Sequence, residues 1–221
     1  MESSSPVPKL VKRRAYDSSS RKAAAQETRR SIIEAARRLF LERGYAGTTM
    51  LAIAQATGVA LDTIYATVGK KPTLFRLLVE TAISGSDEAI PALERDYVRA
   101  IQAEPDAAQK LRMYAAALRI FQPRLAPLFQ VLQAAAPLEP ELGALWQEIS
   151  RRRAANMRLF AMNLAETGRL RTGLSVPMAA DIIWSMNSPE FYVLLAVERG
   201  WSPEQFEHWL ADAWIRMLLE Q

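Results

Sequence analysis

Two short helical patterns separated by one glycine constrain the fold of this chain more than any other feature. Thr49 is a typical N-cap for a helix over residues 50–57, and a second short helix follows over 61–67. Where two helices cross closely, the contact position of the first must be small, and Ala54 meets that need. Gly58, four residues later, can adopt the positive φ that such a turn favours. This spacing predicts a helix-turn-helix.

Three apolar residues support the same interpretation. Ile53, Val59 and Ile64 would close a small core behind the crossing and leave the outer face of the second helix free for a DNA major groove. Alanine, glycine and isoleucine at this spacing also occur in ordinary helical cores. The triplet alone therefore leaves both interpretations open.

Helical periodicity continues on both sides of this motif and predicts an all-α fold. A helix over 24–43 has one apolar face and ends before Gly44, and Pro72 is placed to begin the next helix. Further along the chain, prolines separate several helical segments. We expect helices over 87–102, 106–121, 124–135, 139–167, 177–187, 189–199 and 203–219.

Charge is distributed unevenly along the chain. Residues 1–80 contain 14 Lys and Arg against 7 Asp and Glu, a balance of +7, whereas residues 81–221 have a balance of −3 within the total of +4. The positive surplus therefore lies in the part of the chain where a polyanion would be bound. A solvated basic face would give the same balance, so charge alone does not decide.

The first 23 residues contain basic side chains without helical periodicity and predict a disordered basic arm. Other helix-turn-helix proteins use such arms in the DNA minor groove, and a solubilising tail is the alternative. The arm residues expected to contact DNA are Arg13, Arg14, Arg21 and Lys22, with Lys9 and Lys12 before them.

The composition excludes several classes of function. The chain has no cysteine, hence no disulfide or thiol chemistry, and its one histidine, His208, lies outside any metal-ligand spacing. No stretch approaches the roughly 18 apolar residues of a membrane span, and the N-terminus lacks the apolar segment of a secretory signal. We therefore expect a cytoplasmic protein that is not an enzyme and holds no metal or cofactor.

The run IIEAARRLFLERGYAGTTMLAIAQATGVALDTIYATVGKKPTLFRLLVE, residues 32–80, resembles the N-terminal domain of the tetracycline-repressor (TetR) family. Its specific features are LFLERGYAGTT, the IAQATGV turn, Thr63-Ile64-Tyr65, and Lys71 ahead of Leu74. The resemblance implies a dimeric, all-α protein whose three N-terminal helices bind DNA. In this family the C-terminal helical domain dimerises and often binds a small molecule that alters DNA affinity.

The resemblance divides the chain into three regions. Residues 1–23 would be the arm, and residues 24–84 the DNA-binding domain with its helix-turn-helix at about 49–68. Residues 85–221 would form a helical regulatory and dimerisation domain, with the dimer held by about 176–219. Those last helices are apolar on more than one face, which suits a dimer, although a monomeric core is the alternative.

The same resemblance assigns roles inside the motif. Thr49 and the helix that follows it would meet a phosphate, Thr63 would face the groove, and Tyr65, Lys71 and the adjacent Lys70 would contact the DNA backbone. Each residue also has a structural alternative. Thr49 would then be only a cap, Tyr65 a packing residue, and Lys71 a solvated lysine.

The opening of the second helix departs from the family pattern. Many members place a small polar residue, a lysine and a glycine or alanine there, whereas this chain has Ala60, Leu61 and Asp62. Base reading would depend on Thr63, on apolar contact of Ala60 or Leu61 with thymine methyls, or on Asp62 accepting from cytosine. For Asp62 the alternative is an interaction with the helix dipole.

These features together predict a sequence-specific regulator, most simply a repressor that a small molecule releases from its operator. A sequence-nonspecific architectural DNA-binding protein and a regulator without an effector are the alternatives. Aromatic and methionine side chains of the C-terminal domain would line an apolar cavity, or else form plain core. The residues expected to line it are Met113, Phe121, Phe129, Trp146, Met157, Phe160, Trp184 and Asn187.

Overall fold

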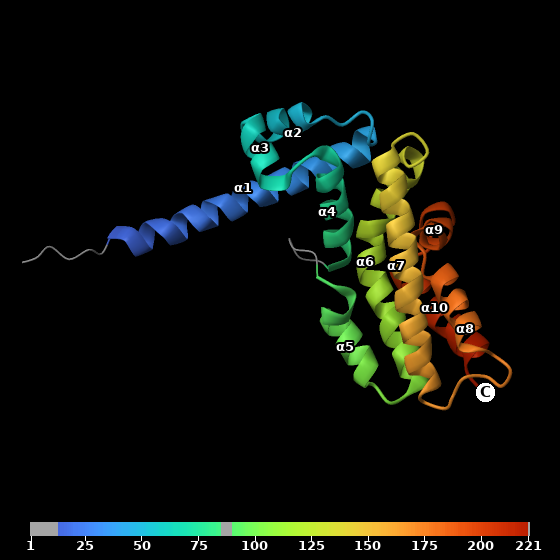
Figure 1. Ribbon diagram of the computed structural model, residues 1–221. Helices are drawn as coiled ribbons and strands as arrows, with labels where there is room; N and C mark the ends of the chain where they lie inside the picture. Colours follow the sequence, from blue (N-terminus) through green and yellow to red (C-terminus); the bar gives the residue numbers. More distant parts are fainter. Residues whose placement is uncertain (1–12, 85–89, 221) are drawn as a thin grey trace, which may run out of the picture.

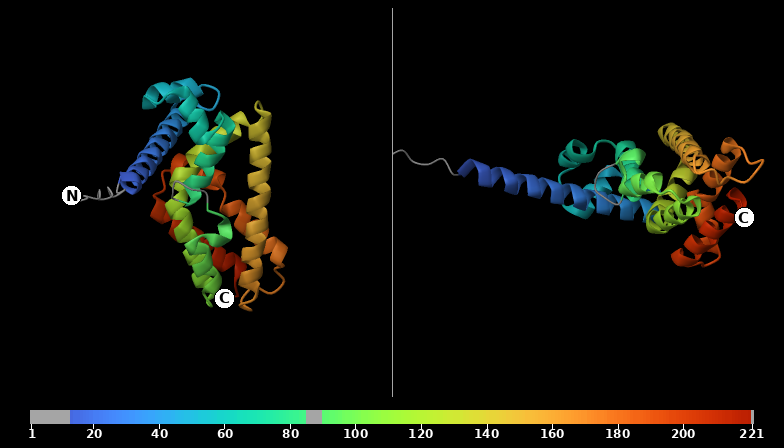
Figure 2. Two further views of the ribbon diagram at one scale, coloured as in Figure 1. Left: turned by 60° about the vertical axis from the view of Figure 1, so that its left-hand side comes forward. Right: turned by 90° about the horizontal axis from the view of Figure 1, so that it is seen from below.

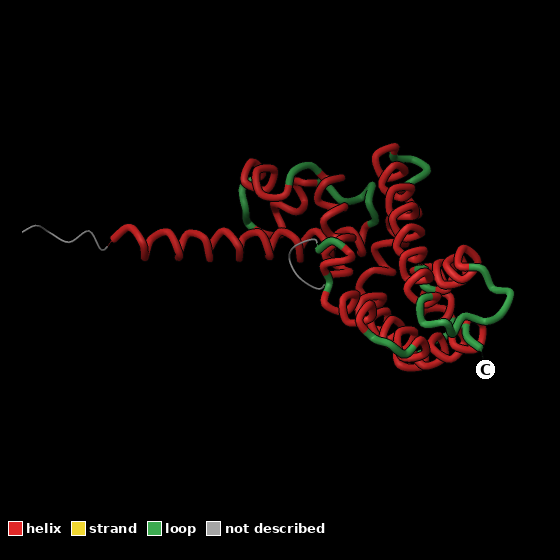
Figure 3. Tube along the Cα trace, turned by 60° about the horizontal axis from the view of Figure 1, so that its bottom comes forward, coloured by secondary structure: helices red, strands yellow, loops and turns green. Residues whose placement is uncertain are grey.

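The computed structural model describes residues 13–84 and 90–220, and this part of the chain is almost entirely helical (Figures 1 and 3). The predicted all-α fold is confirmed; among the described residues, one isolated antiparallel bridge joins Leu170 to Leu219. None of the described helices is by itself long and apolar enough to cross a membrane. The elements are α1 (Arg13–Arg43), α2 (Met50–Thr57), α3 (Leu61–Val68), α4 (Lys71–Ser84), η1 (Ala92–Glu94), α5 (Asp96–Ala103), α6 (Ala107–Ala135), α7 (Pro140–Ala165), α8 (Val176–Met186), α9 (Pro189–Tyr192), the π-helical η2 (Val193–Glu198) and α10 (Pro203–Leu218).

Helices α1 to α4 form a small domain (Figure 1). Its core contains a cluster of three aromatic rings. The ring of Phe40 stacks on Tyr45 with 5.7 Å between centroids and meets the edge of Phe75 at 5.1 Å. Ile53 of α2 and Ile64 of α3 are fully buried in the same hydrophobic core. Burying each such side chain contributes about 1.5–3 kcal/mol relative to exposure, so this core fixes α2 and α3 against α1.

Helices α6 and α7 run side by side through the second domain (Figures 1 and 2). Helix α8 packs on α7 and α10 packs on α6, while α4 and α5 pack on the opposite side. Trp214 of α10 is fully buried and stacks on Tyr114 of α6 with 5.6 Å between centroids. Both rings belong to the hydrophobic core and join α6 to α10.

Helix α6 corrects one prediction. The sequence predicted two helices, over 106–121 and 124–135, but α6 continues through both Pro123 and Pro127. A proline inside a helix removes one hydrogen bond and costs about 3 kcal/mol. Apolar residues before, between and after the prolines are buried in one core. Their shared burial outweighs the local cost, and residue-by-residue propensity does not include that term.

The predicted helix over 87–102 is shorter than expected. Helix α5 begins at Asp96, after a 3₁₀ turn that follows Pro91. Arg95 between them has an extended backbone, with φ −73° and ψ 134°, so the two elements cannot form one continuous helix. Residues 85–89 lie outside the described part of the chain.

The start of α1 corrects a third prediction. Residues 13–23 were expected in the disordered arm, but they are helical and continue α1, which projects from the domain (Figure 2). The arm residues 1–12 lie outside the described range. The side chains of residues 20–27 are exposed, so packing does not explain this helix. Extending an existing helix needs no new nucleus, and the alanines, arginine, lysine and glutamine here favour helix strongly.

Candidate nucleic-acid interface and internal cavity

Helix α2 begins and ends where the sequence predicted. Thr49 has an extended backbone, and its Oγ1 accepts a hydrogen bond from the N–H of Ala52 at 3.0 Å. At the other end, Gly58 has a φ of 69°, a conformation that a Cβ would strain. The cap and the turn therefore stand as predicted from local sequence.

The crossing of α2 and α3 has helix-turn-helix geometry. The two helix axes turn by 108° at the break between them, within the range typical of this motif. Ala54 is buried at the crossing, and Ile53 and Ile64 are fully buried behind it, with Val59 packed beside them. The predicted small core is thus present, and it turns the opposite side of α3 outward.

The outward face of α3 carries most of the side chains expected to read DNA. Ala60, Asp62, Thr63 and Tyr65 are exposed, Tyr65 to 44%. Leu61 is only partly exposed because it packs against the domain core, so it offers a base less surface than the sequence suggested. The face therefore presents two hydroxyl groups, one carboxylate and little apolar surface.

Helix α1 supports the end of α3 through a residue that the sequence analysis did not single out. Nη1 of Arg29 donates to the carbonyl oxygen of Thr67 at 3.0 Å. Thr67 lies in the last turn of α3, where a cation complements the helix dipole. The sequence shows only a basic pair, Arg29-Arg30. The neighbouring residues do not indicate that one of these two side chains reaches α3.

Lys71 is engaged in a structural contact that the sequence did not predict. Its Nζ donates to the carbonyl oxygens of Tyr45 at 2.9 Å and Thr48 at 3.0 Å, and it lies 4.1 Å from the centroid of the Tyr45 ring. Partial burial lowers the pKa of Lys71, whereas burial raises the pKa of Tyr45 to about 12. Lys71 therefore fixes the loop between α1 and α2 to the start of α4.

The other cations predicted to contact DNA lie next to α3 or on the N-terminal part of α1. Lys70 is exposed beside α3, and Arg21 and Lys22 are exposed on the projecting part of α1. Arg13 and Arg14 lie in the first turn of that helix. Contact of these residues with DNA stays a prediction, but from Arg13 onward the cations would be presented by a helix rather than by a disordered chain.

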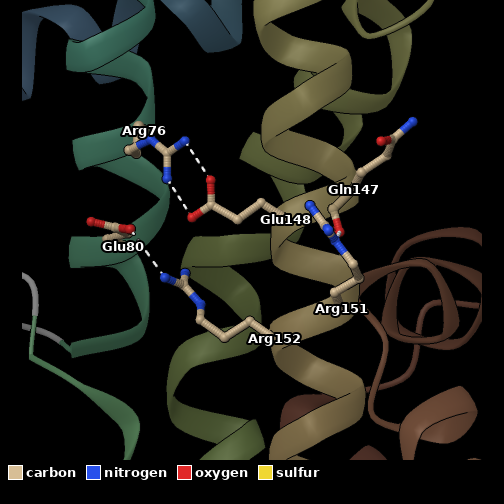
Figure 4. A network of polar contacts seen from close by, with 6 residues as sticks. All are labelled: Arg76, Glu80, Gln147, Glu148, Arg151 and Arg152. Atoms are coloured by element: carbon tan, nitrogen blue, oxygen red, sulfur yellow. Dashed lines mark hydrogen bonds and ion pairs between the residues drawn. The ribbon is translucent and has the colours of Figure 1, made fainter.

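Two ion pairs join α4 to α7, and we name them the α4–α7 latch (Figure 4). Arg76 donates two parallel hydrogen bonds of 2.7 Å to the carboxylate of Glu148. One turn along, Nη1 of Arg152 lies 3.3 Å from Oε1 of Glu80. Arg151, also on α7, instead donates to a carbonyl within its own helix.

The Arg76–Glu148 pair shifts the pKa of both partners. The hydrogen bonds from Arg76 lower the pKa of Glu148, and the bond to Glu148 raises the pKa of Arg76. Both side chains are more than a third exposed, so solvent weakens the pair energetically. The bidentate geometry of the pair nevertheless fixes the relative position of α4 and α7 better than a single hydrogen bond would.

A cavity of about 600 Å³ lies between α4 of the first domain and α5, α6 and α7 of the second. Glu80 and Ile83 of α4 line one side, and Asn187, after α8, reaches it from the other. This volume is within the range of small-molecule sites. The cavity therefore combines an apolar lining with direct contact to the helix that follows the helix-turn-helix.

Half of the predicted cavity residues line it. Phe121, Met157, Phe160 and Asn187 do, as does Tyr114. The other four do not line this cavity, because their side chains pack elsewhere. Phe129 and Trp146 pack on one another at 5.6 Å, Trp184 covers Arg153, and Met113 packs against the core outside the cavity.

A polar network closes one side of the cavity around Asn187, which is 4% exposed. Nδ2 of Asn187 donates to the hydroxyl of Tyr114 at 2.7 Å. Nε2 of Gln122 donates to the backbone carbonyl oxygen of Asn187 at 2.8 Å. Nη2 of Arg153 donates to its Oδ1 at 2.6 Å. Burial lowers the pKa of Arg153 and raises that of Tyr114.

Arg153 and Gln122 were missed by the sequence analysis, although a signal for Arg153 existed. Arg153 follows Ile149 by four residues and precedes Met157 by four, so it shares the buried stripe of α7. A charged residue on an apolar stripe is a candidate binding residue. The run Arg151-Arg152-Arg153 concealed this, because it suggests a solvated face.

The last helices expose large apolar side chains, as the predicted dimer would require. Met178 of α8, Trp209 and Met217 of α10, and Leu194 and Val197 of η2 are all exposed. Exposed apolar side chains often mark protein interfaces where they adjoin one another. Dimerisation stays a prediction.

A helix-turn-helix at one end of the molecule and a cavity enclosed by helices at the other define the class: a two-domain helix-turn-helix protein. The model of the family described as "Bacterial regulatory proteins, tetR family" matches residues 32–77. This match lies within the segment whose sequence resembles that family, residues 32–80.

Several known proteins are similar to this chain in sequence or in fold. The HTH-type transcriptional regulator TtgR of Pseudomonas putida is 40% identical over 75 residues, 34% of this chain and 36% of TtgR, so little more than a third of TtgR is matched. NalD, the secondary repressor of the MexAB-OprM multidrug efflux pump in Pseudomonas aeruginosa, is similar with a TM-score of 0.69 and 20% identity, covering 90% of this chain and 99% of NalD. Bacillus subtilis FadR, solved with stearoyl-CoA, has a TM-score of 0.66 and 20% identity, covering 85% and 97%. At such identity the structures show the shared fold.

Proposed function

We propose that this chain is a sequence-specific transcriptional repressor that a small molecule releases from its operator. It would act in the cytoplasm as a homodimer held by residues about 176–219, with one α3 in each of two half-sites. The proposal includes no enzymatic activity, metal or resident cofactor.

The observation that carries the proposal is the double role of α4. Leu74 and Phe75, near its start, are fully buried in the core of the DNA-binding domain. Glu80 and Ile83, near its end, line the cavity. A ligand that fits the cavity better in one position of α4 would therefore shift the helix-turn-helix between two positions. NalD is described as a repressor and FadR was solved with a ligand, which supports both halves of this proposal.

The two alternatives differ from this proposal in what they require. An architectural protein would bind all DNA sequences about equally, and it needs no cavity in contact with α4. A regulator without an effector would keep its DNA affinity whatever enters the cavity.

One experiment separates these functions. The affinity of the protein is measured for the region upstream of its own gene and for random DNA at one salt concentration. A specificity ratio of about 10³ or more is expected for a repressor and a ratio near one for an architectural protein. Repeating the titration with compounds that bind the protein then tests release.

A further inference from the structure

Arg153 lines the cavity with a guanidinium whose hydrogen-bonding capacity is only partly used. Its Nη2 donates to the carbonyl oxygen of Trp184 at 3.0 Å and to Oδ1 of Asn187 at 2.6 Å. Its Nε and Nη1 have no acceptor among the residues that the structure describes. An arginine offers five N–H donors in a planar fork, so donors remain for a ligand.

The other two arginines of the cavity wall are satisfied differently. Arg152 pairs with Glu80 in the α4–α7 latch, and Nε of Arg95 donates to the carbonyl oxygen of Ile90. Arg153 forms no ion pair with any described residue. Glu190 acts on it only through a longer-range attraction, and Trp184 through a cation–π contact at 5.3 Å.

Arg153 is partly buried, and burying a cation that has no ion-pair partner is unfavourable. The arrangement persists because Asn187 and the Trp184 carbonyl orient the guanidinium, but neither carries a charge. A carboxylate brought to the free N–H groups would supply the missing charge, and it matches the arginine fork in geometry. Arg153 is thus oriented by its neighbours and still lacks a counter-ion.

The rest of the cavity fits an apolar body. The α7 residues that line it extend from Ile149 to Asn163, a length on the order of 20 Å at the helical rise. Phe160 meets Tyr114 edge to face at 5.2 Å on one side, and Phe121 lies 6.3 Å from Tyr97 on another. Such a lining suits a long hydrocarbon or linked aromatic rings.

We propose that the ligand of this cavity is an amphipathic monocarboxylate whose carboxylate pairs with Arg153 while its apolar part lies between α6 and α7. The proposal rests on the effector function proposed above, since it names the chemical class of that effector. It also makes Arg153 the residue that distinguishes a carboxylate from a neutral molecule of the same shape.

Calorimetric titration with two matched pairs of probes tests the proposal. Dodecanoate is compared with dodecanol, and biphenylcarboxylate with biphenylmethanol, on the full-length protein. At least one carboxylate should bind tenfold or more tightly than its alcohol. Carboxylates that bind no better than their alcohols would overturn the proposal.

Variants then locate the preference. Arg153→Gln should reduce it to about twofold or less, Arg153→Lys should keep part of it, and Arg158→Gln, on an exposed position of the same helix, should keep all of it. If Arg95→Gln removes the preference and Arg153→Gln does not, the assignment to Arg153 is wrong.

Glu190→Gln gives a test that does not depend on the folding of the Arg153 variants. Removing the carboxylate that attracts Arg153 should raise dodecanoate affinity severalfold and leave dodecanol affinity unchanged. An equal change for both probes would count against the proposal.

The DNA titration is kept separate, so that the two proposals can fail independently. Carboxylate binding through Arg153 without any change in DNA affinity would leave the ligand class standing and refute its role as an effector. Specific DNA binding by a protein that shows no carboxylate preference would leave the DNA-binding function standing and refute the ligand class.

Discussion

The ammonium of Lys71 lies 4.1 Å from the ring centroid of Tyr45 and donates a hydrogen bond of 2.9 Å to the carbonyl oxygen of the same residue. A second bond of 3.0 Å reaches Thr48, one residue before the cap of α2. The first residue of α4 thus holds the loop that positions the helix-turn-helix. Movement of α4 would be transmitted to α2 through this side chain as well as through the apolar core.

Replacing Lys71 should destabilise the DNA-binding domain. In Lys71→Met, two charge-assisted hydrogen bonds to carbonyl oxygens are lost, at a cost on the order of 1–3 kcal/mol in the free energy of unfolding. Lys70→Met changes an exposed neighbour and should cost little. Urea unfolding of both variants measures the difference. If Lys71 also contacts a phosphate, its variant alone will lower the salt slope of DNA binding by about one per subunit.

Substitutions of Thr63 and Tyr65 should affect DNA binding differently, because Thr63 is expected to contact a base and Tyr65 a phosphate. Thr63→Val removes a hydroxyl from the face expected to meet bases, so it should cost on the order of 1–3 kcal/mol on the natural operator and much less on one altered at the matching base pair. Tyr65→Phe removes a hydroxyl expected at a phosphate and should weaken all sequences about equally. Binding titrations on natural, altered and random DNA decide. A Thr63 variant with unchanged preference would assign base reading to other residues or to DNA shape.

The α4–α7 latch should carry part of the response to a ligand. Glu148→Gln breaks the two-pronged contact with Arg76 and should reduce the change in DNA affinity that a bound ligand causes, while leaving ligand affinity nearly unchanged. Arg151→Gln, one helical turn away and without a partner on α4, is the matched control. Both are assayed for ligand binding and DNA release. Equal release by wild type and Glu148→Gln would exclude the latch from signalling.

The Arg76–Glu148 pair should make the free energy of unfolding depend on pH in a predictable direction. Because Arg76 lowers the pKa of Glu148 below its ordinary value of 4.5, the pair stabilises the fold fully above about that pH. This contribution is lost as the pH falls through the lower, folded-state pKa. The stability difference between wild type and Glu148→Gln should therefore be present at pH 7 and shrink below pH 4. A difference that is constant with pH would show that the carboxylate charge does not matter.

Substitution of two exposed methionines tests whether α8 and α10 form the dimer interface. Met178→Asp and Met217→Asp place charges on exposed apolar positions of α8 and α10 and should produce folded monomers in sedimentation experiments. Trp214 lies on the same helix as Met217 but is fully buried on Tyr114. Trp214→Ala should instead cost about 3–5 kcal/mol in stability. A wild-type protein that sediments as a monomer would refute the dimer.

The parts of the fold predicted correctly are those set by local chemistry. Thr49 caps its own helix and Gly58 needs only its own φ, so both could be placed from neighbouring residues. Pro123 could not, because the continuity of α6 depends on burial against helices far along the chain. The structural contacts of Lys71 and Arg153 could not be predicted for a related reason. Their partners are carbonyl oxygens and an amide, which leave no signature in a sequence.

Helix α1 connects the exposed cations Arg21 and Lys22 to the buried residues Ile32 and Phe40 without interruption. The direction in which these cations point is therefore set by helical phase. One residue inserted near Ala25 would rotate everything before it by about 100° and advance it by about 1.5 Å, with no change in charge. A flexible tail would tolerate such an insertion. In a continuous helix, the number of residues between Arg21 and the buried core determines the direction in which each cation points.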